Sequence, residues 1–252
     1  MRDSASNKFV AALAIIATPF ALGAFMLAWS PAVQYGLEDP KRDGYVQPRS
    51  VYDLVDKTSE STVTVWCEVS KNNGTQGTAW AIELETAVSD IYPTTLITNH
   101  HVIEDCIGGK GEVTIALPGQ SKREAIVVDW DAKNDLAVLA SKSNYPVLKL
   151  SESDPYPGYW VMAFGSADGY EGSVAFGNVL NVYGNDLLIT NNLSHGNSGG
   201  PLIDNEGNVI GVTTWGSTTE QYNGAVSLDA FCVKILDCQY EYDGEKTWWD
   251  YS

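Results

Sequence analysis

The chain has 252 residues, of which 44% are hydrophobic and 8 are tryptophan, a composition typical of a globular protein that buries a core. It carries 15 basic and 32 acidic residues, which give a formal net charge of −17 at pH 7. Phosphate binding needs clustered Lys and Arg, so this charge excludes nucleic acid as an expected partner. The 23 glycines and many short β-branched runs favour an all-β architecture.

The N-terminal segment contains an apolar run that is free of charged residues from Phe9 to Trp29. A run of this length suffices to cross a bilayer as one helix. A cleaved signal peptide is the alternative, because Ser30-Pro31-Ala32 has the small residues found at cleavage sites. We therefore expect residues 1–30 to be a transmembrane anchor, or residues 1–32 to be removed from a secreted protein. In both cases the rest of the chain lies outside the cytoplasm.

The central part of the chain predicts many short strands. Residues 31–57 combine Pro, Gly and mixed charges and predict a linker, with a short helix over residues 51–57. The expected strands cover residues 62–69, 78–85, 94–98, 112–117, 125–130, 136–140, 159–164, 173–183, 186–190, 201–203 and 209–215. Strands this short and this closely spaced predict a β-barrel or a pair of barrels. Ser227 is expected to cap a last helix over residues 228–236.

The four cysteines are compatible with two disulfides in an exported protein, or with free thiols in a cytosolic one. None has the C-x-x-C spacing of a metal site. Of the three possible pairings we expect Cys67 with Cys106 and Cys232 with Cys238. An intact helix would separate the last pair by about 9 Å, so the helix must end or bend before Cys238.

A glycine-rich stretch around Ser198, with the sequence Gly-Asn-Ser-Gly-Gly, has two interpretations. It is either a polar turn between strands or a turn that exposes a nucleophile. Hydrolysis through serine also needs a base and a carboxylate that orients this base. The chain has only three histidines, at positions 100, 101 and 195, and Asp135 stands directly before an apolar run.

Three sequence blocks resemble the signature blocks of the chymotrypsin/trypsin-like serine proteases. These are Thr98-Asn99-His100-His101-Val102, Asn134-Asp135-Leu136-Ala137-Val138-Leu139 and Gly196-Asn197-Ser198-Gly199-Gly200-Pro201-Leu202. They occur in the family's order of His, Asp and Ser and are most similar to the bacterial high-temperature-requirement branch. The resemblance implies an all-β, two-barrel chymotrypsin-like domain over residues 58–240 with a short C-terminal helix, followed by an acidic aromatic tail over residues 241–252.

The resemblance also implies a role for each residue of the motifs. His101 becomes the general base, Asp135 the carboxylate that orients it, and Ser198 the nucleophile. The backbone N–H groups of Gly196 and Ser198 become the oxyanion hole. His100 is then structural, and the remaining carboxylate candidates, at positions 129 and 131, are weaker because neither directly precedes the apolar run.

A substrate-binding set follows from the same resemblance. Its members are Asn192, His195, Thr214, Trp215, Gly216 and Val226. Asn192 stands where trypsin-like members place the residue at the pocket floor, and its lack of charge argues against a preference for Arg or Lys. Thr214, Trp215 and Gly216 lie in a segment similar to the strand that pairs with the substrate backbone.

Two departures from the family pattern change what is expected. Asn197 stands where zymogen-activated members have an Asp that pairs with a newly freed N-terminus, so we expect no activation by N-terminal cleavage. About 54 residues follow Ser198, too few for the peptide-binding PDZ domain that the high-temperature-requirement proteases often append.

Other functional classes fit the sequence less well. An α/β-hydrolase also uses G-x-S-x-G, but its histidine follows the serine, and no histidine follows Ser198. Adjacent histidines suit a single metal ion poorly, so we expect neither a metal nor a cofactor. The expected protein is a serine endopeptidase acting on peptides or proteins, with membrane attachment through its N-terminal helix. The alternative is a catalytically inactive protease fold that serves as a binding module.

Overall fold

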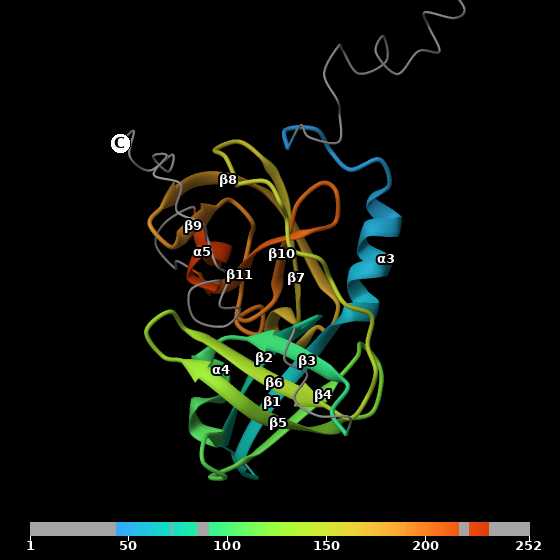
Figure 1. The fold of residues 1–252 in the computed structure, drawn as a ribbon, viewed down its shortest axis with the longest axis vertical. Helices are drawn as coiled ribbons and strands as arrows, with labels where there is room; N and C mark the ends of the chain where they lie inside the picture. The colour runs from blue at the N-terminus through green and yellow to red at the C-terminus, as the bar shows by residue number, and fades with distance from the viewer. Residues whose placement is uncertain (1–43, 72, 85–90, 217–221, 232–252) are drawn as a thin grey trace, which may run out of the picture. The chain divides into compact units, whose positions relative to one another are not determined.

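The computed structural model describes residues 44–71, 73–84, 91–216 and 222–231, without the side chain of Trp215. These residues belong to one compact unit that begins at Gly44. Within them, twelve strands form two closed antiparallel barrels of six strands each (Figure 1). The strand order is β1-β2-β3-β6-β5-β4 in the first barrel and β10-β11-β12-β9-β8-β7 in the second. This confirms the predicted all-β, two-barrel fold.

The strands of the first barrel are β1 (Thr62–Ser70), β2 (Asn73–Ile82), β3 (Thr94–Thr98), β4 (Glu112–Ala116), β5 (Arg123–Asp131) and β6 (Leu136–Ser141). Those of the second barrel are β7 (Trp160–Gly165), β8 (Ser173–Tyr183), β9 (Asp186–Ile189), β10 (Pro201–Ile203), β11 (Val209–Gly216) and β12 (Asn223–Ser227). The helical segments are α3 (Val51–Ser61), α4 (His100–Ile103), η1 (Glu104–Cys106), η2 (Ala167–Gly169) and α5 (Leu228–Phe231).

Two strands differ from the sequence prediction by more than two residues at an end. β2 begins at Asn73 rather than at Thr78, and β12 was not predicted at all. In both places Asn and Gly residues favour a turn, and Asn223-Gly224 is a typical hairpin-turn pair. In the structure, however, β12 pairs with β11 on one side and with β9 on the other. Backbone pairing on both edges overrides the local preference. The predicted helix 228–236 is present as α5, and its remaining residues lie outside the described ones.

Alternation of side chains along the strands divides the core into three parts. On β6, Ala137 and Leu139 point into the first barrel, whereas Leu136 and Val138 belong to a core between the barrels. Since both faces of this strand are covered, all of its residues are buried and its sequence is a continuous apolar run. The core between the barrels draws on both of them, and the Trp80 ring stacks there on Phe231 of α5. Burial of these apolar side chains holds the two barrels together.

The segment before β1 packs on the barrels. Ser50 caps α3 by accepting a hydrogen bond from the N–H of Asp53, and Leu54 is buried in the core between the barrels. The carbonyl oxygen of Gly44 accepts a hydrogen bond from the N–H of Trp160 at 2.8 Å. Part of the expected linker, residues 44–57, thus contributes to the domain. Within the described part of the chain no helix is long and apolar enough to span a membrane, and the predicted anchor lies outside it.

One disulfide joins Cys67 of β1 to Cys106 of η1, across 39 residues of sequence. Both cysteines are buried. The bond ties η1, which directly follows α4, to the first barrel. Cys232 and Cys238 lie outside the described residues.

We expect replacement of both Cys67 and Cys106 by Ala to lower the free energy of unfolding by about 2–4 kcal/mol, because the unfolded chain regains the entropy of an open loop. Urea unfolding followed by tryptophan fluorescence measures this loss. Reduction of the wild-type protein should reproduce the shift without any change of sequence. Identical midpoints for the variant and the oxidised wild-type protein would contradict the expectation.

Candidate active site

His101 lies at the junction of β3 and α4, in the first barrel. The strand ends at Thr98, Asn99 is the N-cap, and His101 is the second residue of the short helix. The backbone N–H of His101 donates to Asp135 Oδ1 at 2.9 Å, and its ring Nδ1 lies 2.7 Å from Asp135 Oδ2. Its side chain is 44% exposed, so the opposite edge of the ring is accessible.

Asp135 is positioned by the tight turn between β5 and β6. Asp131 Oδ1 accepts hydrogen bonds from the N–H groups of Lys133 and Asn134, which closes the turn. The backbone of Asp135 has a φ of 53°, a left-handed conformation that costs energy in a residue with a Cβ. Asn99 Nδ2 donates to the carbonyl oxygen of Asp135 at 2.6 Å and holds this conformation in place.

Thr214 of β11, in the second barrel, also contributes to this carboxylate. Its hydroxyl donates to Asp135 Oδ2 at 2.6 Å. Burial alone would raise the pKa of Asp135, but the hydrogen bonds from His101 and Thr214 outweigh it and hold this pKa below its ordinary value. An ionised carboxylate can only accept hydrogen bonds, so the ring Nδ1 of His101 carries the proton. In the neutral ring Nε2 is then left with a free lone pair.

Ser198 lies in the turn that leads into β10 of the second barrel. Its carbonyl oxygen accepts a hydrogen bond from the N–H of Thr78 in β2, so the backbone of the serine is tied to the first barrel. Gly199 has a φ of 85°, and a Cβ there would collide with the carbonyl oxygen of Thr78. Only glycine allows the backbone at position 199 to lie this close to the carbonyl oxygen of Thr78.

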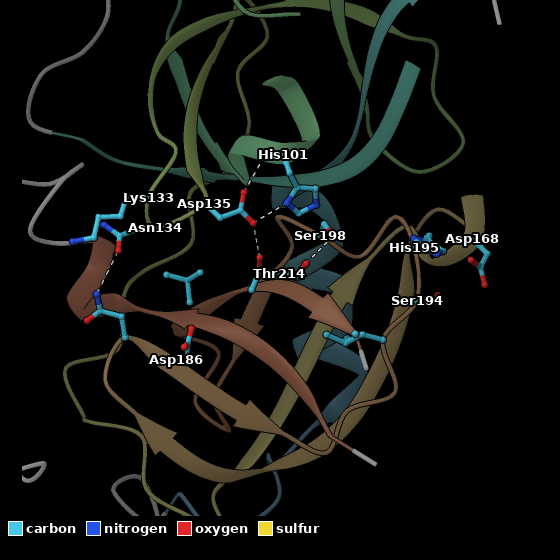
Figure 2. A pocket seen from close by; sticks show the side chains of 14 residues that line it. His101, Lys133, Asn134, Asp135, Asp168, Asp186, Ser194, His195, Ser198 and Thr214 are labelled. Carbon is cyan, nitrogen blue, oxygen red and sulfur yellow. Dashed lines mark hydrogen bonds and ion pairs between the residues drawn. The ribbon is translucent and has the colours of Figure 1, made fainter. Parts of the chain in front are cut away.

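The hydroxyl of Ser198 donates to the carbonyl oxygen of Thr214 at 3.1 Å. Within the described residues no hydrogen bond joins Ser198 to His101, although both face the same cavity (Figure 2). In this state the hydroxyl proton of Ser198 is directed at Thr214 and not at the imidazole of His101. Catalytic hydrogen bonds often tighten only when substrate is bound.

The peptide bond between His195 and Gly196 has a defined orientation. The N–H of Asp168 donates to the carbonyl oxygen of His195 at 2.6 Å. Because C=O and N–H point in opposite directions across a trans peptide, the N–H of Gly196 points away from Asp168. Among the described residues, neither this N–H nor that of Ser198 meets an acceptor. Two backbone donors next to the serine hydroxyl are thus left for a ligand oxygen.

Gly196 is required for this arrangement. Its φ is 92°, and a Cβ there would collide with the carbonyl oxygen of Ser166. Its own carbonyl oxygen accepts a hydrogen bond from the hydroxyl of Thr78 at 2.7 Å. Asp168, whose N–H donates to the carbonyl oxygen of His195, also has a positive φ of 48°. Nothing in the sequence around Asp168 indicated this contact, since it depends on how η2 packs against the serine turn.

A cavity of about 950 Å³ runs past these residues (Figure 2). Of the predicted substrate-binding set it is lined by His195, Thr214, Gly216 and Val226. Asn192 is exposed and is not among the lining residues, and the side chain of Trp215 lies outside the described part.

Besides Leu193 and Ser194, which adjoin the predicted His195, five further lining residues lie outside the predicted site. These are Lys133, Asn134, Asp168, Asn185 and Asp186. Asn185 Nδ2 reaches Asn134 Oδ1 at 3.5 Å, so that the two barrels meet at this end of the cavity. The sequence could not show this contact, because it joins turns that are far apart in the chain. Within the described residues, no cluster of His, Cys, Asp and Glu could hold a metal ion.

Two six-stranded antiparallel barrels, with a His–Asp pair from one and a serine from the other facing one cavity, define the class of the chymotrypsin-like serine proteases. Residues 77–212 match the family model of the trypsin-like peptidase domain. This match covers more than half of the chain, and the chain belongs to this family.

Individual relatives point to one branch of the family. The chain is 36% identical over 130 residues to a probable periplasmic serine endoprotease, DegP-like, from Chlamydia pneumoniae, and 33% identical over 130 residues to one from Pseudomonas fulva. Each match covers 47% of this chain and 26% of the relative, so the similarity spans about a quarter of the relatives' length. The predicted resemblance to the high-temperature-requirement branch is confirmed.

A solved structure gives the same result. The serine endoprotease from Yersinia pestis superimposes with a TM-score of 0.63 at 26% identity, over 76% of this chain and 67% of that chain. The similarity extends beyond the segment matched by the family model and includes both barrels.

Proposed function

We propose that this protein is a serine endopeptidase that hydrolyses peptide bonds through His101, Asp135 and Ser198. The observation that carries the proposal is the His101–Asp135 pair, 2.7 Å apart, on the same cavity as a serine with two free backbone N–H groups beside it. A base, a carboxylate that orients it, and donors for an oxyanion are the three requirements of acyl transfer through serine.

In the first half of the reaction Ser198 Oγ attacks the carbonyl carbon of the scissile bond while its proton passes to Nε2 of His101. The negative charge that develops on the carbonyl oxygen is stabilised by the N–H groups of Gly196 and Ser198. His101 then gives its proton to the leaving nitrogen, the C–N bond breaks, and an acyl-enzyme remains. Asp135 stays ionised throughout and stabilises the imidazolium.

In the second half water takes the place of the leaving amine. His101 accepts a proton from the water as its oxygen attacks the acyl carbon, and returns this proton to Ser198 Oγ when the ester bond breaks. Rotation of the serine hydroxyl away from the carbonyl oxygen of Thr214 precedes the first half, because the resting hydrogen bond directs it away from the base.

The proposed location is outside the cytoplasm. A buried disulfide suits an oxidising compartment, and the DegP-like relatives are named periplasmic. We further propose a membrane anchor over residues 1–30, a linker that ends before Gly44, a protease domain that includes residues 44–57 and extends to residue 240, and a tail over residues 241–252. The proposed substrates are peptides or proteins.

A fluorophosphonate probe tests the proposal directly. We expect the wild-type protein to be labelled at Ser198, with the modified peptide identified by mass spectrometry, because the probe needs an activated serine and a formed oxyanion hole. His101→Ala should strongly reduce the labelling, and Ser198→Ala should abolish it. A folded wild-type protein that stays unlabelled would contradict the proposal.

That negative outcome would support the second candidate, an inactive binding module. One observation favours it: the hydroxyl of Ser198 is bonded to Thr214 rather than to His101. Peptide binding without labelling or cleavage would identify this alternative.

A further inference from the structure

A second cavity, of about 370 Å³, adjoins the first at Ser198. Both cavities are lined by His101, Asp168, His195 and Ser198. The larger one is also lined by Thr214 and Gly216 of β11 in the second barrel, and the smaller one by Thr75 and Gln76 of β2 in the first barrel.

This position assigns the second cavity to one side of the substrate, an assignment that rests on the proposed function. In a bound peptide the residues before and after the scissile bond lie on opposite sides of the nucleophile. If its acyl side lies along β11 in the larger cavity, then the segment after the scissile bond lies in the smaller one. The base His101, which must protonate the leaving nitrogen, lines the smaller cavity as well.

Gln76 lines this second cavity from β2, and its amide has no role in the proposed reaction. Its Nε2 is enclosed and has no hydrogen-bond partner within the described part of the chain. Its amide faces Gly169 of η2: a Cβ on Gly169 would lie 3.9 Å from Oε1 and 4.0 Å from Nε2 of Gln76. Buried amide donors are nearly always paired, so an unpaired one at the wall of a cavity calls for an acceptor from outside.

Asp168 limits which acceptor fits. It is exposed, lines the same cavity, and its carboxylate forms no hydrogen bond with another described residue. An anionic side chain would be repelled by this carboxylate. A hydroxyl or carboxamide side chain, in contrast, can accept from Gln76 and donate to Asp168 at the same time.

We propose that Gln76 is a specificity-determining residue that selects an uncharged polar side chain, such as that of Asn or Ser, at one of the first two positions after the scissile bond. The neighbouring side chain supports this assignment. The hydroxyl of Thr75 donates to the carbonyl oxygen of Val102, which leaves the amide of Gln76 as the unpaired side-chain donor that β2 presents to this cavity among the described residues.

The test uses internally quenched peptides built around a β-casein cleavage site that is first mapped by mass spectrometry. The peptides are identical up to the scissile bond and carry Asn, Ala or Glu at the first or the second position after it. At one of these positions we expect the wild-type kcat/KM to be about tenfold higher for Asn than for Ala, and lower for Glu than for Ala.

Variants at Gln76 separate this contact from general damage. Gln76→Ala removes the amide, and Gln76→Glu keeps its shape but replaces the donor by an acceptor. Both should bring the Asn-to-Ala ratio close to one, whereas Gln120→Ala, at an exposed glutamine in the turn before β5, should keep the wild-type ratio. Circular dichroism checks that each variant is folded.

The outcomes distinguish the inference from the proposed function. Wild-type enzyme that cleaves the peptides without preference at either position, or a Gln76→Ala variant that retains the preference, overturns the role of Gln76 alone. Wild-type protein that cleaves none of the peptides and is not labelled at Ser198 overturns the proposed function and this inference together.

Discussion

Ser198→Ala is expected to lower kcat by about 10⁶-fold while KM changes little, because the substitution removes the atom that forms the acyl-enzyme. A residual acceleration of roughly 10³-fold over the uncatalysed reaction should remain, supplied by the N–H groups of Gly196 and Ser198 and by substrate binding. Hydrolysis of the mapped β-casein peptide, followed by chromatography over long incubation times, measures both numbers.

The alanine variant keeps the fold, since its backbone contacts are those of the wild-type protein: the carbonyl oxygen of residue 198 still meets the N–H of Thr78. Ser121→Ala is a suitable control, because Ser121 is exposed and lies outside both cavities. Wild-type rates in Ser198→Ala would show that another residue is the nucleophile.

Asp135→Asn is expected to lower kcat by about 10⁴-fold. The carboxylate accepts hydrogen bonds from His101 and Thr214, and an amide oxygen and NH₂ group at the same place cannot accept all of them. An amide NH₂ that faces His101 would force the ring into the tautomer with the proton on Nε2, which then has no lone pair for the hydroxyl of Ser198.

The aspartates that the sequence left as weaker candidates are matched controls for this variant. Among the described residues, the side chain of Asp129 accepts only the N–H of the next residue, Trp130, and Asp131 caps the turn before Asp135. Asp129→Asn should retain the wild-type kcat. If Asp129→Asn were to lose as much activity as Asp135→Asn, the assignment of the orienting carboxylate would be wrong.

The same carboxylate makes the stability of the fold depend on pH. The pKa of Asp135 in the folded protein lies below its ordinary value of about 3.9. The ionised form therefore stabilises the fold above about pH 4, and this contribution is lost as the pH falls through the lower value of the folded state. The difference in unfolding free energy between wild type and Asp135→Asn should accordingly shrink on acidification, as urea titrations at neutral and acidic pH can measure.

Much of the fold could be predicted from the sequence, because short apolar and β-branched runs mark most strands and Gly, Asn or Asp marks most turns. The prediction failed where Asn and Gly lie within a strand instead of in a turn. Asn223 and Gly224 form part of β12, where the side chain of Asn223 donates to the carbonyl oxygen of Asn191. The helix before β1 was predicted over residues 51–57 and extends to Ser61, since its buried residues pack against the barrels rather than following a linker pattern.

The candidate site could be predicted only as far as its motifs extend. The motif blocks named His101, Asp135 and Ser198, and the structure brings all three to one cavity. Asp168 and Gln76 carry no motif, because the first acts through its backbone N–H and the second through a side chain on a strand of the other barrel. Contacts of this kind depend on how the two barrels pack against each other, which local sequence patterns do not predict.

The order of the three residues along the chain has a consequence for the cell that makes the protein. The acid and base come from β3, α4 and the turn before β6, and the serine comes from the turn before β10. During synthesis the residues of the first barrel, including His101 and Asp135, therefore leave the ribosome before Ser198. The serine turn appears later and gains its tie to Thr78 only when the second barrel has docked. Under the proposed function, a chain that ends before the second barrel contains the acid and the base but no nucleophile, so the complete site requires both barrels.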